Sequence, residues 1–248
     1  IRYYPSAIYN FASLFRNKEL FLVLPQILTS KFPDGVKIYD YGCSAGYEPV
    51  SIALGLHNAM TEKEIHKYTP IIARDNNSSI IKMAKKYKLE FEDEELARLK
   101  DFNNIDKNIF FVTSVKNENT TKIYECKDIL KNEIVFEEGD LFDDLENGKL
   151  PKEPCVVLLR NAWQYMKPRG KIELSQKLYD NLQPGSIVII GEHDLNSCTK
   201  RFLFNSGFKT LKCNYDFKKY DKSKTCKQDE LLANCQSKQR VSDYCYER

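Results

Sequence analysis

Several patterns typical of common functional classes are missing from this chain of 248 residues. Neither a GxGxxG dinucleotide fingerprint nor a GxxxxGKS/T phosphate loop occurs, which argues against the usual NAD and ATP sites. The chain has no CxxC pair and only three histidines, so zinc-site spacing is absent and we expect no metal. No apolar run approaches the roughly 20 residues that a membrane span requires, so we expect no membrane insertion.

The balance of charge is too mild to indicate a nucleic-acid partner. The net charge is +3, and the lysines are scattered rather than gathered in a stripe, except toward the C-terminus. Hydrophobic residues make up 42% and charged residues 29%, an ordinary globular composition that suits one large domain with an appendage. We expect a cytoplasmic monomer with reduced cysteines. If the protein instead met an oxidising compartment, the five C-terminal cysteines could form disulfides.

The most informative segment present is residues 42–51, Gly-Cys-Ser-Ala-Gly-Tyr-Glu-Pro-Val-Ser, which directly follows a short β-rich run. The glycines at 42 and 46 permit positive φ angles and close approach of a ligand to the backbone. Pro49 fits the first turn of a helix, whose free N–H groups would point into the turn. Glu48 at that helix start would repel phosphate and suits a ligand with an ammonium group or hydroxyls, such as S-adenosylmethionine.

Strands alternate with helices along most of the chain, which indicates a doubly wound parallel α/β sheet. Residues 109–115, 122–126 and 133–136 alternate like strands, and polar turns separate them. This pattern predicts a small antiparallel β-subdomain inserted at about 92–138. The remaining expected strands are 36–41, 70–75, 156–159, 186–190 and 208–217, and the expected helices are 6–30 in two segments, 48–59, 78–88, 92–102, 169–182 and 197–204. Thr61 and Glu64 form a capping-box pattern for a further short helix.

Polar residues at two predicted strand ends and in one turn are candidate ligand contacts. Asp75 ends the second strand, where a carboxylate can bind ribose hydroxyls; the alternative is a helix N-cap. Asp140 and Leu141 follow the inserted strands and could contact an adenine, although Gly-Asp is also a common turn dipeptide. Arg160 and Asn161 end an apolar strand at the sheet edge where ligands bind.

These segments together resemble the CheR-type protein-glutamate O-methyltransferases of bacterial chemotaxis, whose loop typically reads Gly-Cys-Ser-Thr-Gly-Glu-Glu-Pro-Tyr-Ser. Residues 10–16, 73–75, 140–141 and 160–165 match further family segments in order, and the insertion lies where the family carries its β-subdomain. One departure is Tyr47, which stands where the family has the first glutamate of its Glu-Glu pair.

The resemblance implies a class I (Rossmann-like) methyltransferase fold and roles for individual residues. Cofactor binding of S-adenosylmethionine, with S-adenosylhomocysteine as product, is implied for Asn10, Gly42, Gly46, Glu48, Asp75, Asp140, Leu141, Arg160 and Asn161. Glu48 would bind the methionine end, Asp75 the ribose, and Asp140 with Leu141 the adenine. Arg16 and Tyr165 would be catalytic and orient the acceptor, although Arg16 alone also suits an ordinary exposed helix residue.

The implied domains are an N-terminal helical segment at 1–34, the remnant of a larger N-terminal domain, a methyltransferase domain at 35–217, and a polar Cys- and Lys-bearing tail at 218–248. The implied activity is methyl transfer to glutamate carboxylates on the cytoplasmic helices of chemoreceptors. The alternatives are a class I methyltransferase acting on another protein or a small molecule, and a non-catalytic S-adenosylmethionine-binding regulatory module. A NAD-linked oxidoreductase is disfavoured by the missing third glycine.

Overall fold

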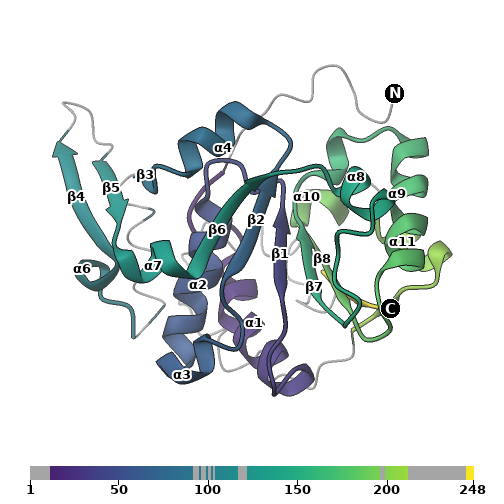
Figure 1. Cartoon of the computed structure of the whole chain (residues 1–248), viewed down its shortest axis with the longest axis horizontal. Helices are drawn as coiled ribbons and strands as arrows, with labels where there is room; N and C mark the ends of the chain where they lie inside the picture. The colour runs from purple at the N-terminus through teal and green to yellow at the C-terminus, as the bar shows by residue number, and fades with distance from the viewer. Residues whose placement is uncertain are drawn as a thin grey trace, which may run out of the picture.

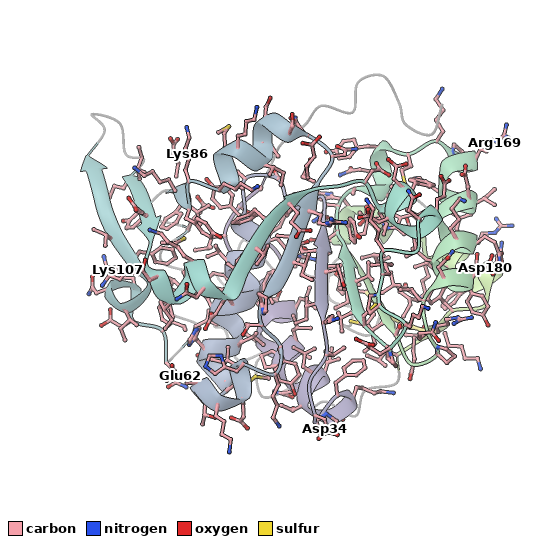
Figure 2. The ribbon with its side chains drawn as sticks, viewed as in Figure 1. Asp34, Glu62, Lys86, Lys107, Arg169 and Asp180 are labelled. Atoms are coloured by element: carbon pink, nitrogen blue, oxygen red, sulfur yellow. The ribbon has the colours of Figure 1, made fainter. Side chains whose placement is uncertain are left out.

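The computed structural model describes residues 12–91, 95, 99, 102, 104–116, 122–195, 199–211 and 244–248, without the side chains of 113–116 and 195. Asn10, the start of the helical region expected at 6–30 and most of the helix expected at 92–102 therefore lie outside the described residues. The charged side chains labelled in Figure 2, Lys86, Lys107 and Arg169 among them, lie at the periphery. None of the helices in the described residues combines the length and apolar character needed to cross a bilayer.

A seven-stranded, mostly parallel sheet forms the centre of the described structure (Figure 1). In spatial order its strands are β6 (Ile134–Glu138), β2 (Ile71–Asp75), β1 (Ile38–Tyr41), β7 (Val156–Leu159), β8 (Ile187–Ile190), β10 (Cys245–Glu247) and β9 (Lys209–Thr210). The first five run parallel, and β10 pairs antiparallel with both β8 and β9. Strand order reverses between β1 and β7, and the crevice at such a switch point is where doubly wound sheets bind ligands.

Helices cover both faces of this sheet, as its sequence pattern predicts. Inner strands buried on both faces send alternate residues to opposite cores, and in β7 Val156 and Leu158 join one core while Val157 and Leu159 join the other. The first core includes residues of α1 (Lys18–Lys31), α2 (Tyr47–Ala59), α3 (Glu62–Ile65), α4 (Ser78–Ala84), α6 (Lys107–Phe110) and α7 (Asp128–Glu133). The second includes residues of α8 (Leu141–Glu146), η2 (Trp163–Tyr165), α9 (Pro168–Asn181) and α11 (Thr199–Ser206). The doubly wound α/β prediction is confirmed.

The small antiparallel sheet exists, but one of its predicted strands is wrong. Its order is β3 (Lys88–Phe91), β5 (Lys122–Cys126) and β4 (Phe111–Lys116). The segment predicted at 133–136 is instead β6, an edge strand of the large sheet parallel to β2. Burial alternates along β6 because one face of this edge strand is open to solvent: Val135 is 39% exposed between buried Ile134 and Phe136.

The third strand of the small sheet is β3, which begins at residue 88, where the helix predicted at 78–88 was expected to end. That helix, α4, stops at Ala84, and Tyr87 adopts a positive φ of 53° that ends helical geometry. In β3 the side chains at 89 and 91 are buried while those at 88 and 90 are exposed. The Phe91 ring stacks on Tyr124 with centroids 4.2 Å apart, so strand pairing outweighs the local helical pattern.

The C-terminal residues also differ from the expectation of a polar tail. Residues 245–247 form β10 inside the large sheet, with Cys245 and Tyr246 fully buried. The closing strand expected at 208–217 corresponds within the described residues to the two-residue β9, which pairs with β10. Cys43, Cys126 and Cys155 are buried free thiols, and Cys245 is buried as well. A strand of three residues is too short for any hydrophobic periodicity to reveal it.

Candidate active site

The glycine loop between β1 and α2 is held by the end of β2. Gly42 and Gly46 both have positive φ angles, 74° and 97°, which glycine adopts without steric cost. The Gly42 N–H donates to the Arg74 carbonyl at 2.7 Å. At Gly46 an added Cβ would lie 2.8 Å from the Phe136 ring, so this glycine is also required for packing.

A cavity of about 380 Å³ opens at the carboxyl ends of β1, β2 and β7. It brings together the predicted site residues from five separate segments: Arg16, Gly42, Glu48, Asp75, Asp140, Leu141, Arg160, Asn161 and Tyr165. Gly46, which packs against Phe136, is not among the lining residues, and Asn10 falls outside the described residues. Convergence of residues so far apart in sequence makes this cavity the candidate active site.

Asp75 faces this cavity and does not cap a helix. One carboxylate oxygen accepts the Ser44 N–H at 3.0 Å and the other accepts the Asn77 N–H at 2.9 Å. The N-cap of α4 is Asn77, whose side chain accepts from the N–H groups of Ser79 and Ile80. Asp75 therefore ties the glycine loop to β2 and presents its remaining lone pairs to the cavity.

Asp140 and Leu141 form the neighbouring wall at the start of α8. Asp140 is the N-cap of this helix, because one of its oxygens accepts the Phe142 N–H at 2.8 Å. Its other oxygen accepts from the Asn76 amide at 3.2 Å. Leu141 is 5% exposed and supplies an apolar surface to the cavity. A carboxylate beside an apolar side chain can accept from an aromatic amine whose ring lies on that side chain.

Arg160 is a buried cation that joins three parts of the chain. It pairs with Glu48 at 2.9 Å and donates at 2.9 Å to both the Arg16 carbonyl and the Asn17 side-chain oxygen. The Asn17 amide in turn donates to Glu192 at 2.5 Å, at the start of α10 (Glu192–Leu195). Arg160 therefore fixes the backbone of the segment that carries Arg16.

Asp194 holds the loop after β7 in place through hydrogen bonds to its backbone. Its buried carboxylate accepts the N–H groups of Asn161 at 2.6 Å, Gly191 at 2.8 Å and Trp163 at 3.0 Å. Asn161 has a positive φ of 56°, and its side-chain oxygen accepts the His193 N–H at 3.3 Å. This cluster determines how Arg160, Asn161 and Tyr165 enter the cavity.

A second acid, Asp40, lies behind Glu48 and is 1% exposed. Burial raises the pKa of Asp40 well above its usual value, and the nearby charge of Glu48 adds to the shift. Burial also raises the pKa of Glu48, against the opposing charges of Arg160 and Arg16. One oxygen of each carboxyl group, Asp40 Oδ2 and Glu48 Oε1, is buried without a hydrogen-bond donor.

Sequence reasoning missed Asp40, Asn17, Glu192 and Asp194. Three of them act through residues far away in sequence: Asn17 and Glu192 are 175 residues apart, and Asp194 lies 33 residues from Asn161. Only Asp40 carried a usable signal, because a carboxylate inside an otherwise apolar strand needs a partner. Within the described part of the chain, no three His, Cys, Asp or Glu side chains form a cluster able to hold a metal.

The residues present fit S-adenosylmethionine. The Glu48 carboxylate, 18% exposed at the cavity wall, offers an acceptor to an ammonium group. Asp75 lies where a ribose would be bound, and Asp140 with Leu141 matches an aminopurine. A polyphosphate fits poorly, since Glu48, Asp75 and Asp140 would all repel it.

Comparison with known proteins gives a consistent result. A family profile described as "CheR methyltransferase, SAM binding domain" matches residues 10–209. A chemotaxis protein methyltransferase of Borreliella burgdorferi (strain B31) is 24% identical over 178 residues, 72% of this chain and 58% of the relative. A chemotaxis protein methyltransferase of Listeria innocua serovar 6a is 24% identical over 187 residues, which cover 73% of this chain and 64% of the relative. The methyltransferase domain of bacterial CtHen1-C, 12% identical over 78% of this chain and 86% of that one, superposes with a TM-score of 0.42, which is too low to add an argument.

Proposed function

Because the chain belongs to the CheR methyltransferase, S-adenosylmethionine-binding domain family, we propose that it methylates glutamate carboxylates on the helices of chemoreceptors. Membership confirms the resemblance, the class I methyltransferase fold and S-adenosylmethionine as cofactor. The chain spans less than two thirds of the length of either curated relative. The acceptor, the partner, the cytoplasmic location and the role of each site residue are therefore parts of the proposal.

The observation that carries the proposal is the meeting of Arg16 and Tyr165 at one cavity with the carboxylates Glu48, Asp75 and Asp140. In the proposal the three carboxylates hold the cofactor, which supplies an electrophilic methyl group when bound. Arg16 pairs with the incoming glutamate, and the Tyr165 hydroxyl fixes its orientation. Methyl transfer to a carboxylate neutralises charge, so the protein mainly has to position the two reactants.

A carboxylate acceptor also matches the described groups at the cavity, because such an acceptor needs no histidine or thiolate to activate it. Glutamate has an ordinary pKa of about 4.3, so it is already ionised at pH 7 and needs no base. The Cys43 thiol at the cavity is kept protonated because burial, with added charge from Asp40 and Asp75, raises its pKa far above the usual value. Among the described lining residues there is no histidine.

Mass spectrometry of a receptor cytoplasmic fragment incubated with the protein and S-adenosylmethionine tests the proposal. We expect added methyl groups on glutamates only. Methylation on lysine, arginine or a small molecule would instead support a class I methyltransferase with another acceptor. Binding of the cofactor with no transfer to any receptor fragment would support the regulatory module.

A further inference from the structure

Two carboxyl groups from consecutive elements meet in the wall behind the cavity. Asp40 is the third residue of β1 and Glu48 the second of α2, and their side chains lie within hydrogen-bonding reach of each other. Glu48 lines the cavity with its side chain 18% exposed, whereas Asp40 is shielded behind it. Glu48 is therefore the only one of the two that a ligand in the cavity can contact.

The charges around this pair do not balance two ionised carboxylates. Arg160, at the end of β7, contacts Glu48, and it also serves the Arg16 carbonyl and Asn17. The charge of Arg16 acts on Glu48 from the segment before α1, while Asp75, at the end of β2, acts on Asp40 with the same sign. Two buried negative charges beside one contacting cation are costly, because little water remains to solvate them.

A single proton resolves the hydrogen bonding of both groups. When both carboxyls are ionised, Asp40 Oδ2 and Glu48 Oε1 each lack a donor. A protonated carboxyl is a donor and a carboxylate is an acceptor, so one proton between them satisfies both side chains. The directions of the pKa shifts agree, since burial raises the pKa of Asp40 and of Glu48. Such a pair titrates as a unit.

We propose that Asp40 and Glu48 share one proton in the ligand-free protein and that the cofactor's ammonium group displaces this proton when it binds to Glu48. The ammonium N–H donates to the Glu48 carboxylate from the cavity side, its positive charge replaces that of the shared proton, and the proton leaves Asp40 for the solvent buffer. One positive charge replaces another, so the buried cluster keeps its net charge. This inference rests on the proposed assignment of Glu48 to the ammonium group.

Proton displacement makes cofactor affinity depend on pH in a defined direction. From about pH 5.5 to about pH 7.5 the ligand's own α-amino group, with a pKa of about 7.7–8.0, stays protonated. Wherever the free protein holds the proton and the complex does not, affinity rises with pH by up to about tenfold per pH unit. Asp40 thereby sets the strength of binding without touching the ligand.

Calorimetry with S-adenosylhomocysteine measures the displaced proton without turnover. Titrations at one pH in phosphate and in Tris, which differ in ionisation enthalpy, give the number of protons released. We expect close to one for S-adenosylhomocysteine and none for 5′-methylthioadenosine, which lacks the ammonium group. The Asp40→Asn variant keeps a donor to Glu48 but has no proton to release, so its affinity should lose the pH dependence. Asp143→Asn, an exposed site on α8, is the matched control and should behave as wild type.

The outcomes separate this inference from the function on which it rests. Failure of S-adenosylhomocysteine to bind would remove the proposed cofactor site itself. Binding with no proton released, or equal release with 5′-methylthioadenosine, would overturn the inference and leave the function standing. If Asp40→Asn does not fold, the comparison of the two ligands on the wild-type protein still decides the matter.

Discussion

At the scale of single residues, the cavity separates groups that would hold the cofactor from groups that would hold the acceptor. Glu48, Asp75 and Asp140 are acceptors of hydrogen bonds at the cavity, and each belongs to a segment that the sequence motifs identify. Arg160 is 5% exposed and engaged with Glu48 and Asn17, so it is a structural cation, whereas Arg16 is half-buried at the cavity.

Replacement of Arg16 should therefore impair transfer far more than cofactor binding. In Arg16→Ala the cation that would orient the acceptor is gone, and we expect turnover to fall by about 100-fold or more. The dissociation constant of S-adenosylhomocysteine should change only a few-fold. Arg169→Ala, at the periphery of α9 in Figure 2, is the matched control. Full turnover by Arg16→Ala would show that its assigned role is wrong.

Replacement of Asp75 should have the opposite profile. Loss of a carboxylate that hydrogen-bonds a ribose costs about 1.5–3 kcal/mol, which corresponds to a rise of about 10- to 100-fold in the cofactor's dissociation constant. Asp75→Ala also removes acceptors for the Ser44 and Asn77 N–H groups, so the thermal midpoint is measured beside it. Unchanged affinity by calorimetry would contradict the ribose assignment.

At the scale of elements, Tyr47 explains a departure from the family pattern. Its hydroxyl donates to the Glu90 carbonyl at 2.5 Å and accepts the Glu90 N–H at 3.0 Å. Glu90 is in the middle of β3, so Tyr47 at the start of α2 fastens the small sheet to the main domain. A glutamate in that position could not make the same pair of bonds, because an ionised carboxylate does not donate.

Removal of that hydroxyl should loosen β3 locally. In Tyr47→Phe both bonds to Glu90 are lost, and we expect faster hydrogen exchange at the Glu90 amide with a loss of about 1 kcal/mol of stability. Amide exchange in β1 and β7 should stay near wild type, which makes those strands the internal reference. Unaltered protection at Glu90 would mean that the small sheet is held by its other contacts.

The elements also show which features the sequence could reveal. The glycine loop, α2 and the inner strands were predictable because glycine geometry, an early proline and apolar runs are local signals. The strand β3 was not, because its stability comes from the stacking of Phe91 on Tyr124, 33 positions away. The strand β6 was found but misplaced, since alternation reports one open face and not which sheet the strand joins. The strand β10 forms because Tyr246 is buried between β8 and β9, which are distant in sequence, and no local pattern predicts that burial.

At the scale of the whole molecule, Asp194 should leave a signature in the pH dependence of stability. Burial, against three backbone donors and the charge of Arg160, raises the pKa of Asp194 to about 7, whereas an unfolded aspartate has a pKa of about 3.9. The folded protein thus binds this proton more tightly than the unfolded chain does. Its contribution to stability is full below about pH 4 and is lost as the pH rises through about 7.

Thermal unfolding of Asp194→Asn at several pH values tests that expectation. The variant should be less stable at every pH, because its amide nitrogen faces backbone N–H groups. Titration of Asp194 should lower the thermal midpoint of wild type between about pH 4 and about pH 7, and the variant should lack this decrease. Parallel curves for the two proteins would show that Asp194 does not titrate in this range.

At the scale of the whole molecule, the proposed function makes one chemical claim, that the product of methyl transfer is a carboxyl methyl ester. A methyl ester is cleaved by mild base with release of methanol, whereas N-methyl groups survive that treatment. The most direct test uses S-adenosylmethionine labelled in its methyl group, a receptor cytoplasmic fragment, and the wild-type and Arg16→Ala proteins side by side. We predict that wild type labels the fragment, that base releases the label as volatile methanol, and that Arg16→Ala leaves the fragment unlabelled. Label that stays on the fragment in base would contradict the account.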